Sequence, residues 1–113
     1  MVTEAYARKL EIIKEDAGLS RTEVAQILRT SPRTVVRWAS RQAAPRGETR
    51  ERLLELAVVS QRAAKVMKPE AVSIWLFEPN VFLDFERPVD LVASGQYRDV
   101  IGAIDAIGEG VFV

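Results

Sequence analysis

The chain contains no cysteine and no histidine among its 113 residues. The missing cysteine excludes disulfide bonds and thiolate metal sites. The missing histidine removes the commonest general base, metal ligand and pH switch. No apolar run reaches the roughly 20 residues that a membrane-spanning helix needs, and the first residues do not form a signal peptide. We therefore expect a cytoplasmic protein that does not interact with a membrane, uses no metal or cofactor and is not an enzyme.

The net charge is zero, but the two halves of the chain differ strongly in charge. Residues 1–68 hold 14 Lys or Arg and 8 Asp or Glu, a balance of +6, whereas residues 69–113 hold 2 and 8, a balance of −6. Such an asymmetry favours a basic module for nucleic acid joined to an acidic module with another partner. The alternative is a dipolar monomer without such a purpose.

Two short helices joined by a tight turn are predicted between residues 20 and 41. Ser20 and Glu23 have the spacing of a capping box, and Ser31 before Pro32 marks a second helix start. Each helix has an apolar face at helical spacing. These faces comprise Val24, Ala25, Leu28, Val35, Trp38 and Ala39. The pattern resembles the helix-turn-helix of Xre/Cro-type DNA-binding domains, although Arg29 stands where glycine is common. The alternative is a helical hairpin that only packs.

The other face of the second helix is basic. A helix from Pro32 to Arg41 would place arginines four residues apart and away from the apolar face, and such arginines bind phosphates or guanine edges. The candidate DNA-binding residues are Ser31, Arg33, Thr34, Arg37 and Arg41. A solvated basic face is the alternative interpretation.

The remaining pattern predicts an all-α fold. Helices are expected at residues 3–17, 48–67, 69–77, 89–93 and 96–107, with a compact apolar turn at residues 81–85. We predict a helix-turn-helix domain at residues 1–47, a bridging helix at residues 48–67 and a small helical domain with a C-terminal tail at residues 68–113. The bridging helix is apolar on more than one side, so it should contact both modules.

The second half carries a more specific motif. Trp75-Leu76-x-x-Pro79-Asn80 precedes Pro88, Gly95 and Gly108 at set distances. This combination resembles the toxin-binding domain of the Xre/MbcA/ParS antitoxin family, and residues 110–113 resemble the ending of its MbcA branch. The departure is residues 82–84, where many relatives have a glycine-containing segment.

This resemblance implies a type II antitoxin that neutralises a RES-domain toxin, a protein that degrades NAD, and that binds the operator DNA of its own operon. We expect the apolar tail to occlude the toxin's active site, or alternatively to fold back onto its own domain. The candidate toxin-binding residues are Trp75, Pro79, Asn80, Gly110, Val111, Phe112 and Val113. Trp75 could instead belong to the core, and Asn80 could instead cap a turn.

A second function remains open: a free-standing Xre-family transcription regulator whose acidic half serves for dimerisation. In either case we expect a homodimer or a hetero-oligomer with the toxin, because dimers reading two half-sites are usual for this motif.

Overall fold

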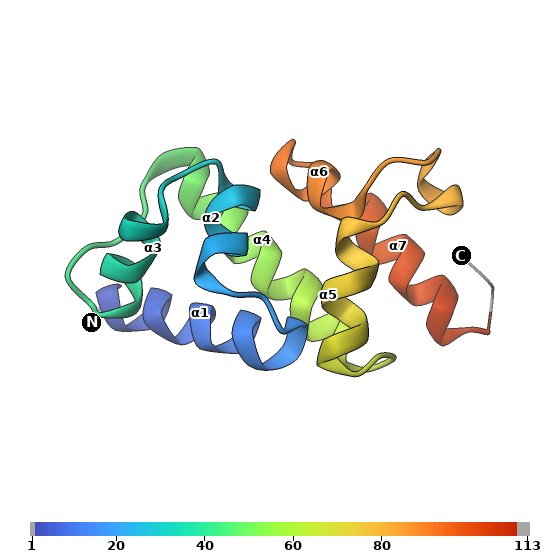
Figure 1. Ribbon diagram of the computed structural model, residues 1–113, viewed down its shortest axis with the longest axis horizontal. Coiled ribbons are helices and arrows are strands. Elements are labelled where there is room, and N and C mark those ends of the chain that lie inside the picture. Colours follow the sequence, from blue (N-terminus) through green and yellow to red (C-terminus); the bar gives the residue numbers. More distant parts are fainter. Residues whose placement is uncertain (1, 111–113) are drawn as a thin grey trace.

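The computed structural model describes residues 2–110, and the predicted all-α class is confirmed over that range. Its helices, with the 3-10 helix named η1, are α1 (Val2–Ala17), α2 (Arg21–Leu28), α3 (Pro32–Ala39), α4 (Gly47–Ala64), α5 (Pro69–Phe77), η1 (Val81–Leu83), α6 (Pro88–Ala93) and α7 (Tyr97–Gly108) (Figure 1). The one strand-like feature of these residues is an isolated antiparallel bridge between Asn80 and Glu86.

Helix α4 lies at the centre of the arrangement, with α1 packed along it and α7 against its C-terminal part (Figure 1). Leu53, Leu56 and Val59 of α4 are completely buried. A single cluster of buried side chains runs from α1 to α7. Burial of an apolar side chain of this size contributes about 1.5–3 kcal/mol, so this shared cluster is the main source of stability for both halves.

The turn after α1 depends on glycine. Gly18 has a φ of +65°, and a Cβ built there would lie 3.0 Å from the carbonyl oxygen of Pro69. Glycine adopts this left-handed conformation without steric cost. The C-terminal end of α1 therefore meets the N-terminal end of α5 at close range.

Helix α4 ends earlier than its sequence pattern predicts, at Ala64 rather than Met67. Lys65 and Val66 donate instead to carbonyls three residues back, at 3.3 and 3.0 Å. Pro69 limits how far a helix could continue, since the residue before a proline avoids the helical conformation, and Lys68 is extended with a ψ of 155°. The chain uses the intervening residues to turn into α5.

The molecule is elongated, with extents of 42 × 23 × 20 Å. Helices α2 and α3 lie at one end, and η1 and α7 lie toward the other (Figure 1). Helices α2 and α3 of the basic half thus lie apart from η1 and α7 of the acidic half, whereas α1 and α4 pack against helices of the acidic half. Across residues 2–110, every helix falls short of the length and apolarity that crossing a bilayer demands.

Candidate functional site

Both short helices of the basic end begin with the side-chain caps that the sequence predicts. Ser20 Oγ accepts a hydrogen bond from the backbone N–H of Glu23 at 3.1 Å, and Glu23 Oε1 accepts one from the N–H of Ser20 at 2.9 Å. Ser31 Oγ accepts from the N–H of Thr34 at 3.1 Å and lies 2.8 Å from its hydroxyl oxygen. Caps of this kind contribute about 1 kcal/mol each and fix where α2 and α3 start.

The same two helices end in an unexpected way. Arg29 and Arg41 adopt left-handed conformations, with φ of 56° and 64°. The N–H groups of the residues that follow them, Thr30 and Gln42, donate to carbonyls five residues back, each at 2.9 Å. This is the Schellman motif, in which glycine usually holds the left-handed position. Both helix ends therefore hold an arginine in a strained conformation.

The basic face of α3 is smaller than expected. Arg33 and Arg37 are exposed one turn apart, with half-buried Thr34 beside Ser31 at the start of the helix. The expected helix extension to Arg41 is wrong, because α3 ends at Ala39. Arg41 instead lines a groove of about 640 Å³ together with residues of α1 and α2. Arg41 thus lies beyond the end of α3, in a left-handed conformation.

At the acidic end, the residues of the Trp-Leu-x-x-Pro-Asn motif have different environments. Trp75 is half-buried against the core, and its indole Nε1 is buried without a hydrogen-bond partner among the described residues. Pro79 is exposed. Asn80 is 5% exposed, and its Oδ1 accepts from the N–H of Phe82 at 2.8 Å. Asn80 thus caps η1, while Pro79 faces solvent beside it.

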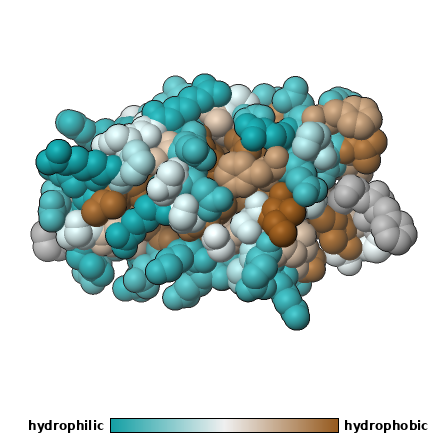
Figure 2. Space-filling view, in the orientation of Figure 1, coloured by the Kyte–Doolittle hydropathy of each residue, from teal (hydrophilic) through white to brown (hydrophobic). Residues whose placement is uncertain are grey.

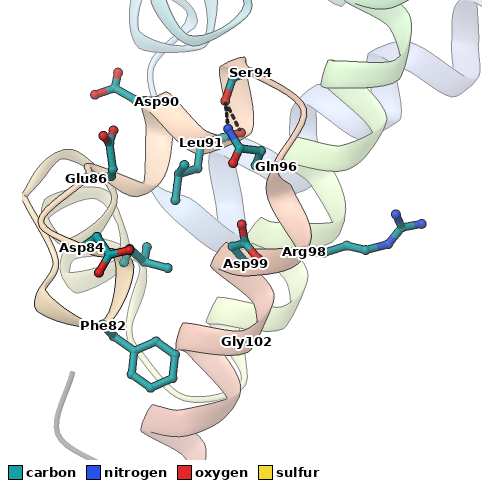
Figure 3. Close-up of a pocket in the computed structure, with 11 residues that line it drawn as sticks. Phe82, Asp84, Glu86, Asp90, Leu91, Ser94, Gln96, Arg98, Asp99 and Gly102 are labelled. Carbon is teal, nitrogen blue, oxygen red and sulfur yellow. Dashed lines mark hydrogen bonds between the residues drawn. The ribbon is translucent and has the colours of Figure 1, made fainter.

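A groove of about 720 Å³ lies between η1, α6 and α7 (Figure 3). Four carboxylates line it, from Asp84, Glu86, Asp90 and Asp99. Arg98 is its only basic lining residue, and Figure 3 shows its guanidinium pointing away from the groove. In the part of the chain that the structure describes, no group of carboxylates is arranged to hold a metal ion. The groove is therefore an acidic surface feature of the C-terminal half.

The pKa of Asp90, one of the carboxylates of this groove, is lowered. Hydrogen bonds from Arg87, at 2.9 Å to each carboxylate oxygen, lower its pKa below the ordinary value of 3.8. The positive charges of Arg87 and Arg29 act in the same direction, and partial desolvation opposes them. Arg29 follows α2, which packs against α6, so this charge acts between neighbouring helices of the two halves of the chain.

Comparison with known proteins identifies the relatives of this chain. It is 42% identical over 99 residues to the mycobacterial cidal antitoxins MbcA of Mycobacterium tuberculosis and Mycobacterium bovis, covering 88% of each chain. The chain belongs to the MbcA antitoxin family. A second M. tuberculosis protein, described as a probable mycobacterial cidal antitoxin, is 32% identical over 85% of this chain and 82% of its own length. No family model matches the chain.

The fold agrees with this family. A chain of the crystal structure of the M. tuberculosis MbcT–MbcA toxin–antitoxin complex superposes with a TM-score of 0.84 and 40% sequence identity, covering 95% of this chain and 96% of that one. The resemblance to MbcA antitoxins that the second-half motif indicates is confirmed. These relatives are named as antitoxins, and nothing in those names indicates catalysis.

Within this MbcA-family fold, the predicted site residues form two separate groups. Arg33, Thr34 and Arg37 lie on α3, which Ser31 caps. Trp75 lies on α5, and Pro79 and Asn80 lie between α5 and η1. Gly110 is exposed two residues beyond α7, with a φ of +86°. The remaining predicted tail residues, Val111, Phe112 and Val113, lie outside the described residues.

The acidic groove and the exposed apolar residues of the loop between α5 and α6 were not assigned a role from the sequence. The available signal was the apolar run at residues 81–83 between Asn80 and Asp84. A run of this kind is equally typical of buried core. Only the folded structure separates its buried member, Leu83, from its exposed members.

Proposed function

We propose that this MbcA-family protein is a type II antitoxin that binds and neutralises a RES-domain toxin that degrades NAD. The observation that carries the proposal is the similarity, along almost the whole chain, to an MbcA relative whose solved structure is a complex with a toxin. Its site of action is the cytoplasm, and its small C-terminal domain at residues 68–113 is the toxin-binding part. Trp75, Pro79 and Asn80 belong to that part.

The C-terminal tail is proposed to occlude the toxin's active site. In support, Gly110 leaves α7 in a left-handed conformation, and residues 111–113 are Val-Phe-Val. Burial of a phenylalanine side chain contributes about 1.5–3 kcal/mol, and a partner's cleft would supply that burial. If the tail folds back onto its own domain instead, deletion of residues 110–113 will leave neutralisation intact.

Co-expression tests the antitoxin function directly. The RES-domain protein from the source genome is produced in a bacterial host with and without this chain, and growth and co-purification are scored. The proposal expects restored growth and a stable complex. Loss of both, with the chain soluble and folded, would leave the free-standing transcription regulator as the better account.

A second proposed activity is binding to operator DNA, which would allow the antitoxin to repress its own operon. The supporting observation is the exposed pair Arg33 and Arg37 on a capped helix whose other face is buried through Val35 and Trp38. In this proposal α2 and α3 form the helix-turn-helix of the domain at residues 1–47, and α4 is the bridging helix. Dimers, formed alone or through the toxin, would read two half-sites.

A further inference from the structure

The loop between α5 and α6 exposes three large apolar side chains next to one another. Val81, Phe82 and Phe85 are 63%, 51% and 71% exposed. The other large apolar side chains exposed within residues 2–110, such as Val36 and Val58, occur singly on separate helices. Apolar surface is visible at the end of the molecule where this loop lies (Figure 2). Clustered exposure of this kind marks an interaction site, whereas scattered exposure does not.

The backbone of the loop holds these side chains in place. Buried Asn80 ties both ends together: its carbonyl oxygen accepts from the N–H of Phe85 at 2.8 Å, and its N–H donates to the carbonyl of Glu86 at 3.1 Å. Leu83, 8% exposed, anchors the loop in the core. Asp84 and Phe85 are both left-handed, with φ of 56° and 66°. A strained loop fixed this firmly presents its phenylalanines in one arrangement, which lowers the entropic cost of binding.

The acidic groove adjoins the same loop. Phe82, Asp84 and Glu86 line it directly, and Asp99 of α7 faces them (Figure 3). Among the described residues, Asp84, Glu86 and Asp99 form no ion pair. Complementary charge across an interface raises both specificity and association rate. The surface therefore fits an occupant that brings apolar atoms to the phenylalanines and positive charge to the groove.

Two occupants could supply that chemistry. One is the basic α3 face of a second copy of this chain, but such a contact would join opposite ends of two molecules. Head-to-tail contacts form rings or open filaments rather than closed dimers, and this one would also cover Arg33 and Arg37. The other occupant is the toxin, which leaves the basic face free. We infer that residues 81–86 and the adjoining acidic groove form a docking site for a toxin surface segment that combines apolar and basic side chains.

This inference rests on the proposed antitoxin function and adds a second contact to it, separate from the tail. The test uses the full-length chain and the RES-domain protein from the source genome, with affinity measured by biolayer interferometry at several salt concentrations. The first variant combines Phe82→Ala and Phe85→Ala, and the second combines Glu86→Lys and Asp99→Lys. Val58→Ala, which removes an exposed apolar side chain from α4, is the matched control. Circular dichroism verifies that each variant is folded.

We expect the phenylalanine variant to weaken binding by about tenfold or more. The charge variant should weaken binding at low salt and lose most of the salt dependence of the wild-type chain. Val58→Ala should bind like the wild type. Affinities of both variants within about twofold of wild type would overturn the inference while leaving the antitoxin function intact.

A wild-type chain that fails to bind the toxin would instead refute the proposed function itself, and the inference with it. Analytical ultracentrifugation compares the oligomeric state of the free wild-type chain with that of the two variants. If the wild type self-associates and both variants are monomeric, a second copy occupies the groove and the inference is wrong.

Discussion

The guanidinium group of Arg52 occupies the space that a side chain at residue 95 would need. A Cβ built on Gly95 would lie 2.7 Å from Nη2 of Arg52. The arginine cannot easily move away, because its Nη atoms also contact Glu48 at 3.2 Å and Glu55 at 2.9 Å, and its side chain is only 17% exposed. Gly95 thus allows the turn between α6 and α7 to close against α4.

Substitution of Gly95 by alanine should destabilise the fold by more than backbone strain alone. The matched control is Gly47→Ala: Gly47 also has a positive φ, +58° against +85°, but a Cβ there would meet nothing within 4 Å. Left-handed strain costs roughly 1–2 kcal/mol in both variants, and displacement of Arg52 adds to it only at residue 95. Urea unfolding gives the two free energies. Equal losses would show that the guanidinium moves aside freely.

The opposite result is expected at Gly102, in the interior of α7. This glycine has no positive φ, and a Cβ there would meet nothing within 4 Å. Gly102→Ala should therefore stabilise the protein by about 0.5–1 kcal/mol, because alanine loses less conformational entropy in a helix. Thermal unfolding checks the gain. Since Gly102 also lines the acidic groove, weaker toxin binding by this more stable variant would support the docking site independently.

DNA binding, if it uses α3 as proposed, should depend on two arginines. Arg33→Ala and Arg37→Ala should each weaken binding to the operon's promoter DNA and reduce its salt slope by about one. Fluorescence anisotropy between about 50 and 200 mM salt measures both quantities. Arg98→Ala, in α7 near the acidic end, is the control. Unchanged affinity in both α3 variants would indicate a helix pair that only packs.

The pairing of Arg87 with Asp90 should make a small, pH-dependent contribution to stability. Because the pKa of Asp90 is lowered in the folded protein, the contribution is complete above its ordinary value of 3.8 and is lost as the pH falls through the lower folded value. Both side chains are nearly half exposed, so solvent screens the pair and Arg87→Ala should lower the free energy of unfolding only slightly near neutral pH. Urea unfolding should show this difference shrinking below about pH 4. A difference that persists in acid would assign it to packing instead.

Local signals in the sequence were sufficient to locate most helices. The capping box at Ser20 and the Ser31-Pro32 pair act within three residues of each helix start, and both are present as predicted. Helix α5 has the predicted bounds because Pro69 and Pro79 delimit it from both sides. Such signals are readable because they depend on neighbours in the chain.

The structure differs from the prediction where contacts between residues far apart in the sequence determine the conformation. Nothing in the sequence around Arg41 indicates a left-handed conformation. The helix predicted from the sequence was therefore too long, and its predicted basic face was too large. Likewise, the apolar run at Val81 and Phe82 resembles core, and the capped loop built on Asn80 determines which side chains reach solvent. The carboxylates of the acidic groove come together only through the packing of η1, α6 and α7.

Because α4 packs against α1 and α7 within one buried cluster, the two halves form one rigid body rather than two domains joined by a flexible linker. An antitoxin that bound DNA at one end and toxin at the other would therefore fix both the distance and the orientation of the bound DNA relative to the toxin. Toxin-linked copies would present their reading helices in fixed rotational phase, and their operator sites would have to recur on the same face of the double helix. Insertion of about five base pairs, half of the DNA repeat, would turn one site out of reach.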